Sequence, residues 1–509
     1  MFRIFGPPGT GKTTTLLNMV EKAMESGIPP QRVGFFAFTV KAATEAKERA
    51  VARFNLDPDV DLPHFRTIHS LAYRQLGVRD HQMMSTENWQ EFGSKILINS
   101  NIDLKPTQMD EENSVSFRAS DHLIMRLINL SRAKKTTLKK VCSEYPGYIP
   151  FNTYEINYVA DSYRNYKEAY GVLDFSDLLE EFAAEADLLL PEFDICFVDE
   201  AQDLSSVQWD IVHALDKKSK RLYVAGDDDQ AIYTWAGADV DQFVSVIGDA
   251  EVLEQSYRVP RRVHAVAEKI ANRITNRFPK RYLPKPEEGK VDSVRNVTDL
   301  DMSNGKWLIL AQANYMLREV ADELKSRGYL FQKPDGYRSI PEKMSRAILG
   351  WEQLRKGQQV SYDVAKIIYS YMSGNNVRIK RGHKKIIADE DQLFSLRDLQ
   401  EHYGLLADDS MIWCDAMDRI PPGDREYIRA LLKKGEKFSA TPKIKLSTIH
   451  GSKGGESQNV VVLTDLTTAA LSQNNDELHR MYYVAVTRAS ESLYIVQPKD
   501  YDKAYTLLC

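Results

Sequence analysis

Long apolar runs are missing from this chain of 509 residues, and cysteine is scarce. No stretch approaches the ~18 uninterrupted apolar residues that a membrane-spanning helix needs, so the sequence predicts no membrane association. The four cysteines form no Cys-x-x-Cys pair, which excludes a disulfide framework and a zinc site and favours the reducing cytoplasm of a bacterial cell or a virus-infected host. Positive charge is not in excess either. The net charge of −5 excludes coating of nucleic acid by bulk charge but leaves room for a local basic channel.

What is present is the composition of an ordinary globular protein, with 43% hydrophobic and 27% charged residues. At ~100–200 residues per domain, the length predicts three or four domains. Apolar strands alternate with helical patterns over residues 1–80 and 190–260, as in a parallel sheet covered by helices. The stretch between them is mostly helical in pattern. We therefore expect an α/β fold.

The second half of the chain repeats this alternation with interruptions. Residues 277–290 are rich in proline and charge, which suits an interdomain linker, and "KWLILAQAN" (306–314) starts another strand and helix. Residues 345–440 have the pattern of a separate insertion. After it, residues 443–466 predict a strand, a loop and a strand.

A phosphate-binding loop begins at residue 6, where a signal peptide would otherwise stand. The segment "GPPGTGKTTT" matches Gly-x-x-x-x-Gly-Lys-Thr, between a predicted strand at Phe2–Phe5 and a helix from about Lys12. The backbone N–H groups of such a loop surround a phosphate at the positive end of the helix dipole. Lys12 would reach the β- and γ-phosphates, and the Thr13 hydroxyl would hold Mg²⁺. The expected nucleotide-binding residues here are Gly6, Pro7, Pro8, Gly9, Thr10, Gly11, Lys12, Thr13 and Thr14.

A second half of this site is expected in "FDICFVDEAQD" (193–203), where an apolar strand ends in Asp199 and Glu200. A carboxylate at the carboxyl edge of a parallel sheet, beside a phosphate-binding loop, can anchor Mg²⁺, and the next carboxylate can orient or deprotonate water. We therefore assign Asp199 to the metal and Glu200 to general base catalysis. The alternative is a solvated acidic strand end.

These segments belong to an ordered series that resembles the motifs of the UvrD/Rep-like superfamily 1 helicases. The resemblance covers nearly the whole chain apart from two insertions. Besides the phosphate-binding loop and "DEAQD", the matching segments are "FFAFTVKAATEAKERA" (35–50), "FRTIHSLAYRQLG" (65–77), "YGVLDFSDLLEEF" (170–182), "VAGDDDQAIYTWAGA" (224–238), "LEQSYRVP" (253–260), "LSTIHGSKGGESQNVVV" (446–462) and "DELHRMYYVAVTRASESLYIV" (476–496).

The resemblance implies two RecA-like motor domains that use ATP and Mg²⁺ to move 3′ to 5′ along single-stranded DNA and unwind duplex. The implied partners are single-stranded DNA, junctions of single and double strands, and replication or repair proteins. By this likeness the domains take these ranges: 1–80 and 166–280 for the first, with a helical insertion at 81–165, and 281–344 and 441–509 for the second, with a short insertion at 345–440.

For the nucleotide, the resemblance assigns Gln230 to sensing the γ-phosphate, Arg258 and Arg488 to contacting it, Tyr257 to stacking on adenine, and Glu456 to the ribose. Phosphoryl transfer needs positive charge at the transition state, and an arginine from a second domain supplies it only when the cleft closes. An ordinary core tyrosine remains the alternative for Tyr257. A surface ion pair remains the alternative for Arg488.

For DNA, the resemblance places base-stacking aromatics at Phe38, Tyr233 and Trp235, and phosphate contacts at Thr39, Thr67, His69, Thr448 and His450. Stacking suits a protein that holds bases without reading their sequence. The alternatives are a core strand position for Phe38 and a half-buried interdomain aromatic for Trp235. No ligand residues at metal spacing accompany His69 or His450, so we reject a metal role for them. The basic runs at 131–140 and 377–385 would either grip duplex DNA or form solvated faces.

Three features depart from the family pattern. The glutamine that reads the adenine edge upstream of the phosphate-binding loop has no counterpart in this sequence, so we expect Tyr257 stacking to select the base only weakly. The family's Trp-Arg-Gly-Ala is Trp235-Ala236-Gly237-Ala238 here, without the arginine that helps to link DNA to nucleotide. The insertion at 345–440 is also shorter than usual.

The sequence therefore predicts a DNA-dependent ATPase of helicase type. Two alternatives stay open: a translocase that strips proteins from single strands without efficient unwinding, and a phosphate-loop switch that is not a motor.

Overall fold

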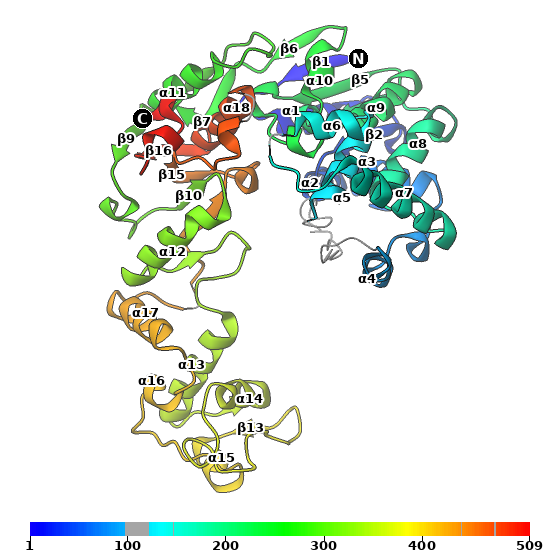
Figure 1. Ribbon diagram of the computed structural model, residues 1–509. Coiled ribbons are helices and arrows are strands. Elements are labelled where there is room, and N and C mark those ends of the chain that lie inside the picture. The colour runs from blue at the N-terminus through cyan, green and yellow to red at the C-terminus, as the bar shows by residue number, and fades with distance from the viewer. Residues whose placement is uncertain (97–121, 146, 439, 473–474) are drawn as a thin grey trace. The chain divides into compact units, whose positions relative to one another are not determined.

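The computed structural model describes residues 1–96, 122–145, 147–438, 440–472 and 475–509 (Figure 1). These residues divide into two compact units: Met1–Lys290 with Thr467–Ser490, and Val291–Leu466 with Glu491–Cys509. The finer domain ranges expected from the sequence remain a prediction, and residues 97–121 of the expected helical insertion lie outside the described residues. Across the described ranges, no helix combines the length and apolar character needed to cross a membrane.

A parallel sheet lies at the centre of the first unit, which confirms the predicted α/β class. Six strands of the described chain form it in the order β3-β2-β4-β5-β1-β6, and each neighbouring pair is parallel. Strands β2 and β4 are buried along their whole length, because their side chains are apolar on both faces of a covered sheet. The strands are β1 (Phe2–Phe5), β2 (Val33–Ala37), β3 (Phe65–Thr67), β4 (Ile195–Val198), β5 (Leu222–Gly226) and β6 (Ala250–Val252).

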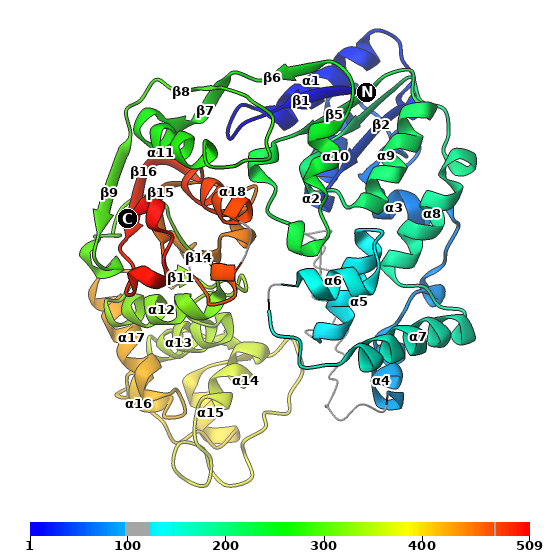
Figure 2. The ribbon, with the colours of Figure 1, turned by 45° about the horizontal axis from the view of Figure 1, so that its top comes forward.

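Helices cover both faces of this sheet (Figure 2). Residues of α1 and α2 share one core with Phe35 and Phe197, and residues of α3, α8, α9 and α10 share another with Phe36 and Val198. The chain therefore passes back and forth across the sheet as a doubly covered α/β domain requires. The helices are α1 (Lys12–Glu25), α2 (Val40–Phe54), α3 (Ile68–Gln75), α8 (Phe175–Leu189), α9 (Ser206–Lys218) and α10 (Val240–Ser245).

The remaining elements of the first unit surround this domain. Helices α4 to α7 have a small core of their own, which includes Phe92, Ile128 and Tyr163. Two short strands, β7 and β8, pair in parallel before the end of the unit. The bounds are α4 (Thr86–Lys95), α5 (Leu123–Ala133), α6 (Leu138–Glu144), α7 (Thr153–Tyr170), β7 (Gln255–Pro260), α11 (Arg261–Ala271), β8 (Leu283–Lys285) and α18 (Asn475–Val486).

The second unit holds the other sheet, in the strand order β11-β14-β10-β15-β16-β9. The pairs of β10 with β14 and β15, and of β11 with β14, are parallel, as the apolar runs at 306–314 and 443–466 predict. The bounds are β9 (Lys290–Val294), β10 (Trp307–Ala311), α12 (Leu317–Ser326), β11 (Phe331–Gln332), β14 (Ile444–Thr448), β15 (Ser457–Leu463) and β16 (Ala489–Val496).

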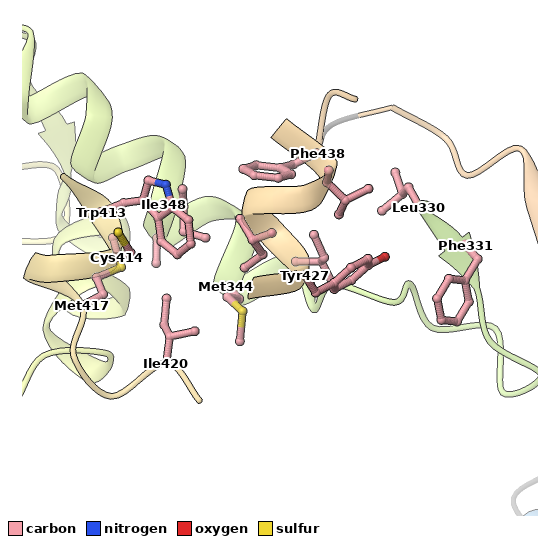
Figure 3. Close-up of a cluster of buried hydrophobic side chains, with 14 of the residues drawn as sticks. Leu330, Phe331, Met344, Ile348, Trp413, Cys414, Met417, Ile420, Tyr427 and Phe438 are labelled. Carbon is pink, nitrogen blue, oxygen red and sulfur yellow. The ribbon is translucent and has the colours of Figure 1, made fainter. Parts of the chain in front are cut away.

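Residues 345–440, expected as an insertion, lie in the second unit and continue its core. Figure 3 shows Met344 and Ile348 from one helix, with Trp413 and Tyr427 from two others, within one apolar cluster that reaches Phe331. Because this core is continuous with the sheet, the insertion is packed onto its unit. Its elements are α13 (Glu342–Arg355), β12 (Val360–Ser361), α14 (Tyr362–Ser370), β13 (Leu393–Phe394), α15 (Leu396–His402), α16 (Trp413–Ala416) and α17 (Pro422–Lys433).

Candidate functional site

The loop Gly6–Gly11 connects the end of β1 to the start of α1, as the sequence predicts. Gly6 donates its N–H to the carbonyl of Gly226, and a Cβ at position 6 would lie 2.6 Å from the Cβ of Lys12. Gly9 and Gly11 have φ of 72° and 76°, a region that favours glycine. The Thr10 hydroxyl donates to the Pro7 carbonyl at 2.8 Å and closes the loop on itself. The glycines thus leave the backbone free to surround a phosphate; Pro8 and the exposed Thr14 complete the predicted loop residues.

Lys12 and Thr13 meet the carboxylates at the end of β4. The Lys12 ammonium lies 2.6 Å from Glu200 Oε1 and 3.3 Å from Asp199 Oδ1, and the Thr13 hydroxyl donates to Asp199 Oδ2 at 2.9 Å. Burial lowers the pKa of Lys12, but the two carboxylates outweigh burial and hold that pKa above its ordinary value. Lys12 is therefore a fixed positive charge in the loop. Glu200 has a φ of 56°, which is rare for a residue with a side chain and typical of functional sites.

Thr13 and Asp199 supply the donor set that Mg²⁺ prefers. Both contribute hard oxygen atoms, and these lie 2.9 Å apart at the mouth of the loop. Mg²⁺ in nucleotide sites is held by one or two such protein oxygens together with phosphate and water oxygens. The residues therefore fit the metal predicted from the sequence. No group of three or more His, Cys, Asp or Glu suited to a metal stands elsewhere in the described ranges.

A partly buried chain of amide contacts continues from Glu200. The Gln202 amide donates to Glu200 Oε2 at 2.5 Å, while its oxygen accepts the backbone N–H of Asp227 at 3.0 Å. The Gln230 amide donates to Asp227 Oδ2 at 2.7 Å, and its oxygen accepts from Arg488 Nη2 at 2.7 Å. The predicted residues Lys12, Glu200, Gln230 and Arg488 thus lie on one continuous network. Sequence reasoning missed Gln202, although its place in "DEAQD" was a signal.

Arg488 follows helix α18 and belongs to the first unit. The sequence predicts that residues 441–509, which include Arg488, belong to the second domain. The structural reason for the difference is a set of contacts from α18 to the first unit. Arg480 donates to the Asp228 carbonyl at 2.9 Å, and the Asp476 carboxylate accepts from the backbone and hydroxyl of Thr275. Arg488 is only 1% exposed, which excludes the surface ion pair as its role.

Strand β7 holds Tyr257 and Arg258 beside the phosphate-binding loop. Tyr257 donates its N–H to the Gly9 carbonyl at 2.8 Å, and the Ser256 hydroxyl donates to the Pro8 carbonyl at 2.7 Å. The loop and strand β7 approach each other so closely that a Cβ on Gly9 would lie 2.3 Å from the Cβ of Arg258. Tyr257 is 75% exposed, so it is not a core tyrosine and can stack on a ligand. Glu456, predicted at the ribose, is exposed on the second unit just before β15.

The three predicted base-stacking aromatics form a row in the first unit. The rings of Phe38 and Tyr233 are 5.6 Å apart, and those of Tyr233 and Trp235 are 6.4 Å apart. Exposure rises along the row, from 8% at Phe38 to 41% at Trp235. Trp235 therefore offers the most ring surface to a base, whereas Phe38 mainly supports Tyr233 from the core.

The predicted phosphate-contacting threonines begin helices or turns. The hydroxyl oxygens of Thr39, Thr67 and Thr448 accept N–H groups of Ala42, Ser70 and Gly451, respectively. A threonine at an N-cap leaves its own O–H and the adjacent N–H groups at the positive end of the helix. His450 begins the turn after β14 on the second unit. Of the five phosphate-contact candidates, Thr67 and Thr448 end strands, and Thr39 and His450 lie two residues beyond a strand's carboxyl end.

His69 lies in the first turn of α3 and meets an aromatic that the sequence analysis missed. Its ring contacts Phe175 edge to face, with centroids 6.3 Å apart, and Phe175 is 42% exposed. Phe175 stands in the segment "YGVLDFSDLLEEF" as the first residue of α8, and an exposed ring can stack on a base.

The basic runs are partly used within the fold. Arg132 bonds to Asp174, Asp177 and Glu180, and Lys135 pairs with Asp210 at 2.6 Å. In the second run, the Lys384 ammonium donates to backbone carbonyls of its own unit. These members of the runs are therefore structural, and exposed neighbours such as Lys385 remain candidates for a solvated face.

Comparison with known proteins agrees with this geometry. The family model of the UvrD/REP helicase N-terminal domain matches residues 2–251, and that of the UvrD-like helicase C-terminal domain matches residues 443–496. Similar proteins include the ATP-dependent DNA helicases PcrA of Bacillus subtilis (28% identity over 305 residues, 55% of this chain and 39% of the relative) and of Leuconostoc citreum (26% over 405 residues, 73% and 50%).

The chain thus spans half or less of the length of these relatives. The two matched domains carry both carboxylates, the phosphate-binding loop and Arg488, which the structure joins in one network. By its two domain matches and this shared site, the chain belongs to the UvrD/Rep-like family of superfamily 1 helicases.

Proposed function

We propose that this protein is an ATP-dependent DNA helicase that moves 3′ to 5′ on single-stranded DNA. The observation that carries the proposal is the network that joins Lys12, Glu200, Gln230 and Arg488 around the phosphate-binding loop. Its family membership and its similarity to ATP-dependent DNA helicases support ATP and DNA as the ligands.

In the proposed mechanism, the loop amides and Lys12 bind the β- and γ-phosphates of ATP, which draws the Lys12 ammonium away from the carboxylates. Thr13 and Asp199 would hold Mg²⁺, which neutralises charge on the phosphate oxygens. Glu200, released from Lys12, then orients and deprotonates the attacking water. Gln202 keeps this carboxylate in place.

Positive charge at the transferred phosphate would come from Arg258 and Arg488. Gln230 bonds to Arg488 and to Asp227, which follows β5. A change at the γ-phosphate that moves Gln230 would therefore move both of these partners. Tyr257 would stack on the base, and Glu456 would contact the ribose. Since Gln230 shares the segment 224–238 with Tyr233 and Trp235, a change at the phosphate can alter the grip on DNA.

On the DNA side, Trp235 and Tyr233 would stack on bases, and Phe175 would add a further platform. The capping threonines, with His69 and His450, would bind the backbone. Each stacked base is worth ~1–3 kcal/mol without sequence preference, as a translocating protein requires.

Ala236 favours a second candidate, a translocase that displaces proteins without efficient unwinding. The family has an arginine here that helps to link DNA to nucleotide, whereas this chain has a buried alanine. Weaker coupling would lower the force of each step more than the rate of hydrolysis.

Partial duplexes with a 3′ tail, a 5′ tail or no tail test the proposal, alongside removal of streptavidin from a biotinylated single strand. We expect ATP-dependent unwinding with the 3′ tail alone. Displacement of streptavidin without unwinding would favour the second candidate, and unwinding from the 5′ tail alone would overturn the direction.

A further inference from the structure

Three consecutive aspartates follow strand β5 in the interior of the first unit. Asp227, Asp228 and Asp229 are each 0% exposed. A buried carboxylate is costly unless it is paired and hydrogen-bonded. The surroundings of this segment must therefore supply positive charge.

Lys280 supplies that charge from some fifty residues downstream. Its ammonium lies 3.1 Å from Asp227 Oδ1, 2.5 Å from Asp228 Oδ1 and 2.8 Å from Asp229 Oδ2, and its side chain is 1% exposed. An ammonium has three donors, so it can serve one carboxylate with each. Arg277 adds a two-pronged contact to Asp229 at 2.8 and 2.6 Å. Residues 277–280, expected as part of a linker, are thus anchored in the core.

Asp227 connects this cluster to the candidate catalytic network. Its Oδ2 accepts from the Gln230 amide, and the Gln230 oxygen accepts from Arg488. An ionised carboxylate can only accept, and a guanidinium can only donate. These two neighbours therefore fix which end of the Gln230 amide points toward Arg488.

This orientation depends on the charge of Asp227. Burial raises the pKa of Asp227 to about 6; Lys280 opposes this rise, and the charges of Asp229 and Asp228 add to it. Tyr282, just before β8, and Tyr483 of α18 also face the carboxylate. Without Lys280, Asp227 would bind a proton near neutral pH and could donate to Gln230. The amide would then lose its fixed direction.

We propose that Lys280 is a positioning residue for ATP hydrolysis, which holds Gln230 toward Arg488 by keeping Asp227 ionised. The inference rests on the proposed function, because Gln230 and Arg488 act on the γ-phosphate there. Lys280 itself touches no nucleotide in this scheme. Its contribution passes entirely through Asp227 and Gln230.

A double-mutant cycle tests this route, with ATP hydrolysis measured at saturating oligo-dT. Lys280→Met is expected to lower kcat ~10–100-fold while KM for ATP changes less than ~3-fold. In a Gln230→Ala background, the same substitution is expected to lower kcat less than ~2-fold, since the residue through which it acts is gone. Arg281→Met, on the exposed neighbouring residue, is the matched control and should match wild type.

The pH profile adds a readout that lost stability would not move. The wild-type rate should fall as pH drops through about 6, and the Lys280→Met rate should fall at a higher pH, because Asp227 then protonates more easily. If Lys280→Met does not fold, Lys280→Gln, which keeps a hydrogen-bond donor but removes the charge, replaces it in the same cycle. Equal losses in both backgrounds with an unmoved profile would overturn the inference alone. A wild-type protein without DNA-stimulated hydrolysis would overturn the proposed function as well.

Discussion

The imidazole of His69 is uncharged at neutral pH. Burial lowers its pKa from 6.5 to about 4, so the ring binds a proton only when the pH falls well below 6. A neutral histidine can still donate one hydrogen bond to a phosphate oxygen. It would then position the DNA backbone without releasing a counterion.

The salt dependence of DNA binding distinguishes a neutral hydrogen bond from His69 to a phosphate from a charged contact. For His69→Gln, which keeps a donor, we expect the slope of log affinity for single-stranded DNA against log salt to match wild type at pH 7. For His69→Lys, we expect a slope steeper by ~0.7, the value for one added phosphate contact on a single strand. A His69→Gln slope shallower by that amount would mean that the native ring is charged on DNA.

Among single residues, the sequence predicted those that belong to a short motif of fixed spacing. Lys12 and Thr13 come from one motif, Asp199 and Glu200 from another, and the structure brings the four together. Gln202 and Lys280 were missed because their roles depend on which buried group lies opposite them. Such partners are set by tertiary packing, which a spacing pattern does not contain.

Among the helices and strands, the same arrangement recurs three times: a threonine at or just after the end of a strand caps the next helix or turn. Thr39 ends the segment after β2 and caps α2, with its hydroxyl oxygen 3.2 Å from the N–H of Ala42. Capping uses one lone pair, so the hydroxyl hydrogen stays available to a phosphate. The same side chain can therefore stabilise the helix and bind DNA.

Substitutions at Thr39 separate these two roles. Thr39→Asp keeps a capping oxygen, so we expect the free energy of unfolding to stay within ~0.5 kcal/mol of wild type. Its negative charge should weaken single-stranded DNA binding about tenfold, equal to ~1.4 kcal/mol. Thr39→Ser should match wild type in both measurements. Ser85→Asp, at the cap of α4, is the matched control and should leave DNA binding unchanged; wild-type affinity in Thr39→Asp would show that Thr39 lies away from DNA.

Element positions were predicted well where apolar runs are bounded by turns. Strands β1 and β4 and the start of α1 lie where the sequence placed them, because Gly6 and the acidic pair after β4 end the runs abruptly. The stretch 277–290 differs from a free linker, since its charges pair with buried aspartates. Composition reports that a segment is charged, but it does not report where the opposite charges lie.

At the scale of the whole molecule, the alternation of strand and helix patterns predicted the α/β class, and the order of motifs predicted the family; both predictions are confirmed. Helix α18 was harder to place, because the sequence continues from the second sheet while Arg480 and Asp476 bind the first unit. Residues 467–490 thus belong to the first unit, although the segments on both sides of them in the sequence belong to the second. We expect ATP hydrolysis and DNA binding to be coupled in this molecule.

The most direct test is the steady-state rate of ATP hydrolysis by the full chain with and without saturating oligo-dT. We predict stimulation of at least about tenfold, within the usual range of coupling between two binding sites. Lys12→Ala should abolish hydrolysis in both conditions while it retains DNA binding, because it removes the charge that faces the phosphates. A wild-type rate that is the same with and without DNA would contradict a DNA-driven motor and would favour a nucleotide switch.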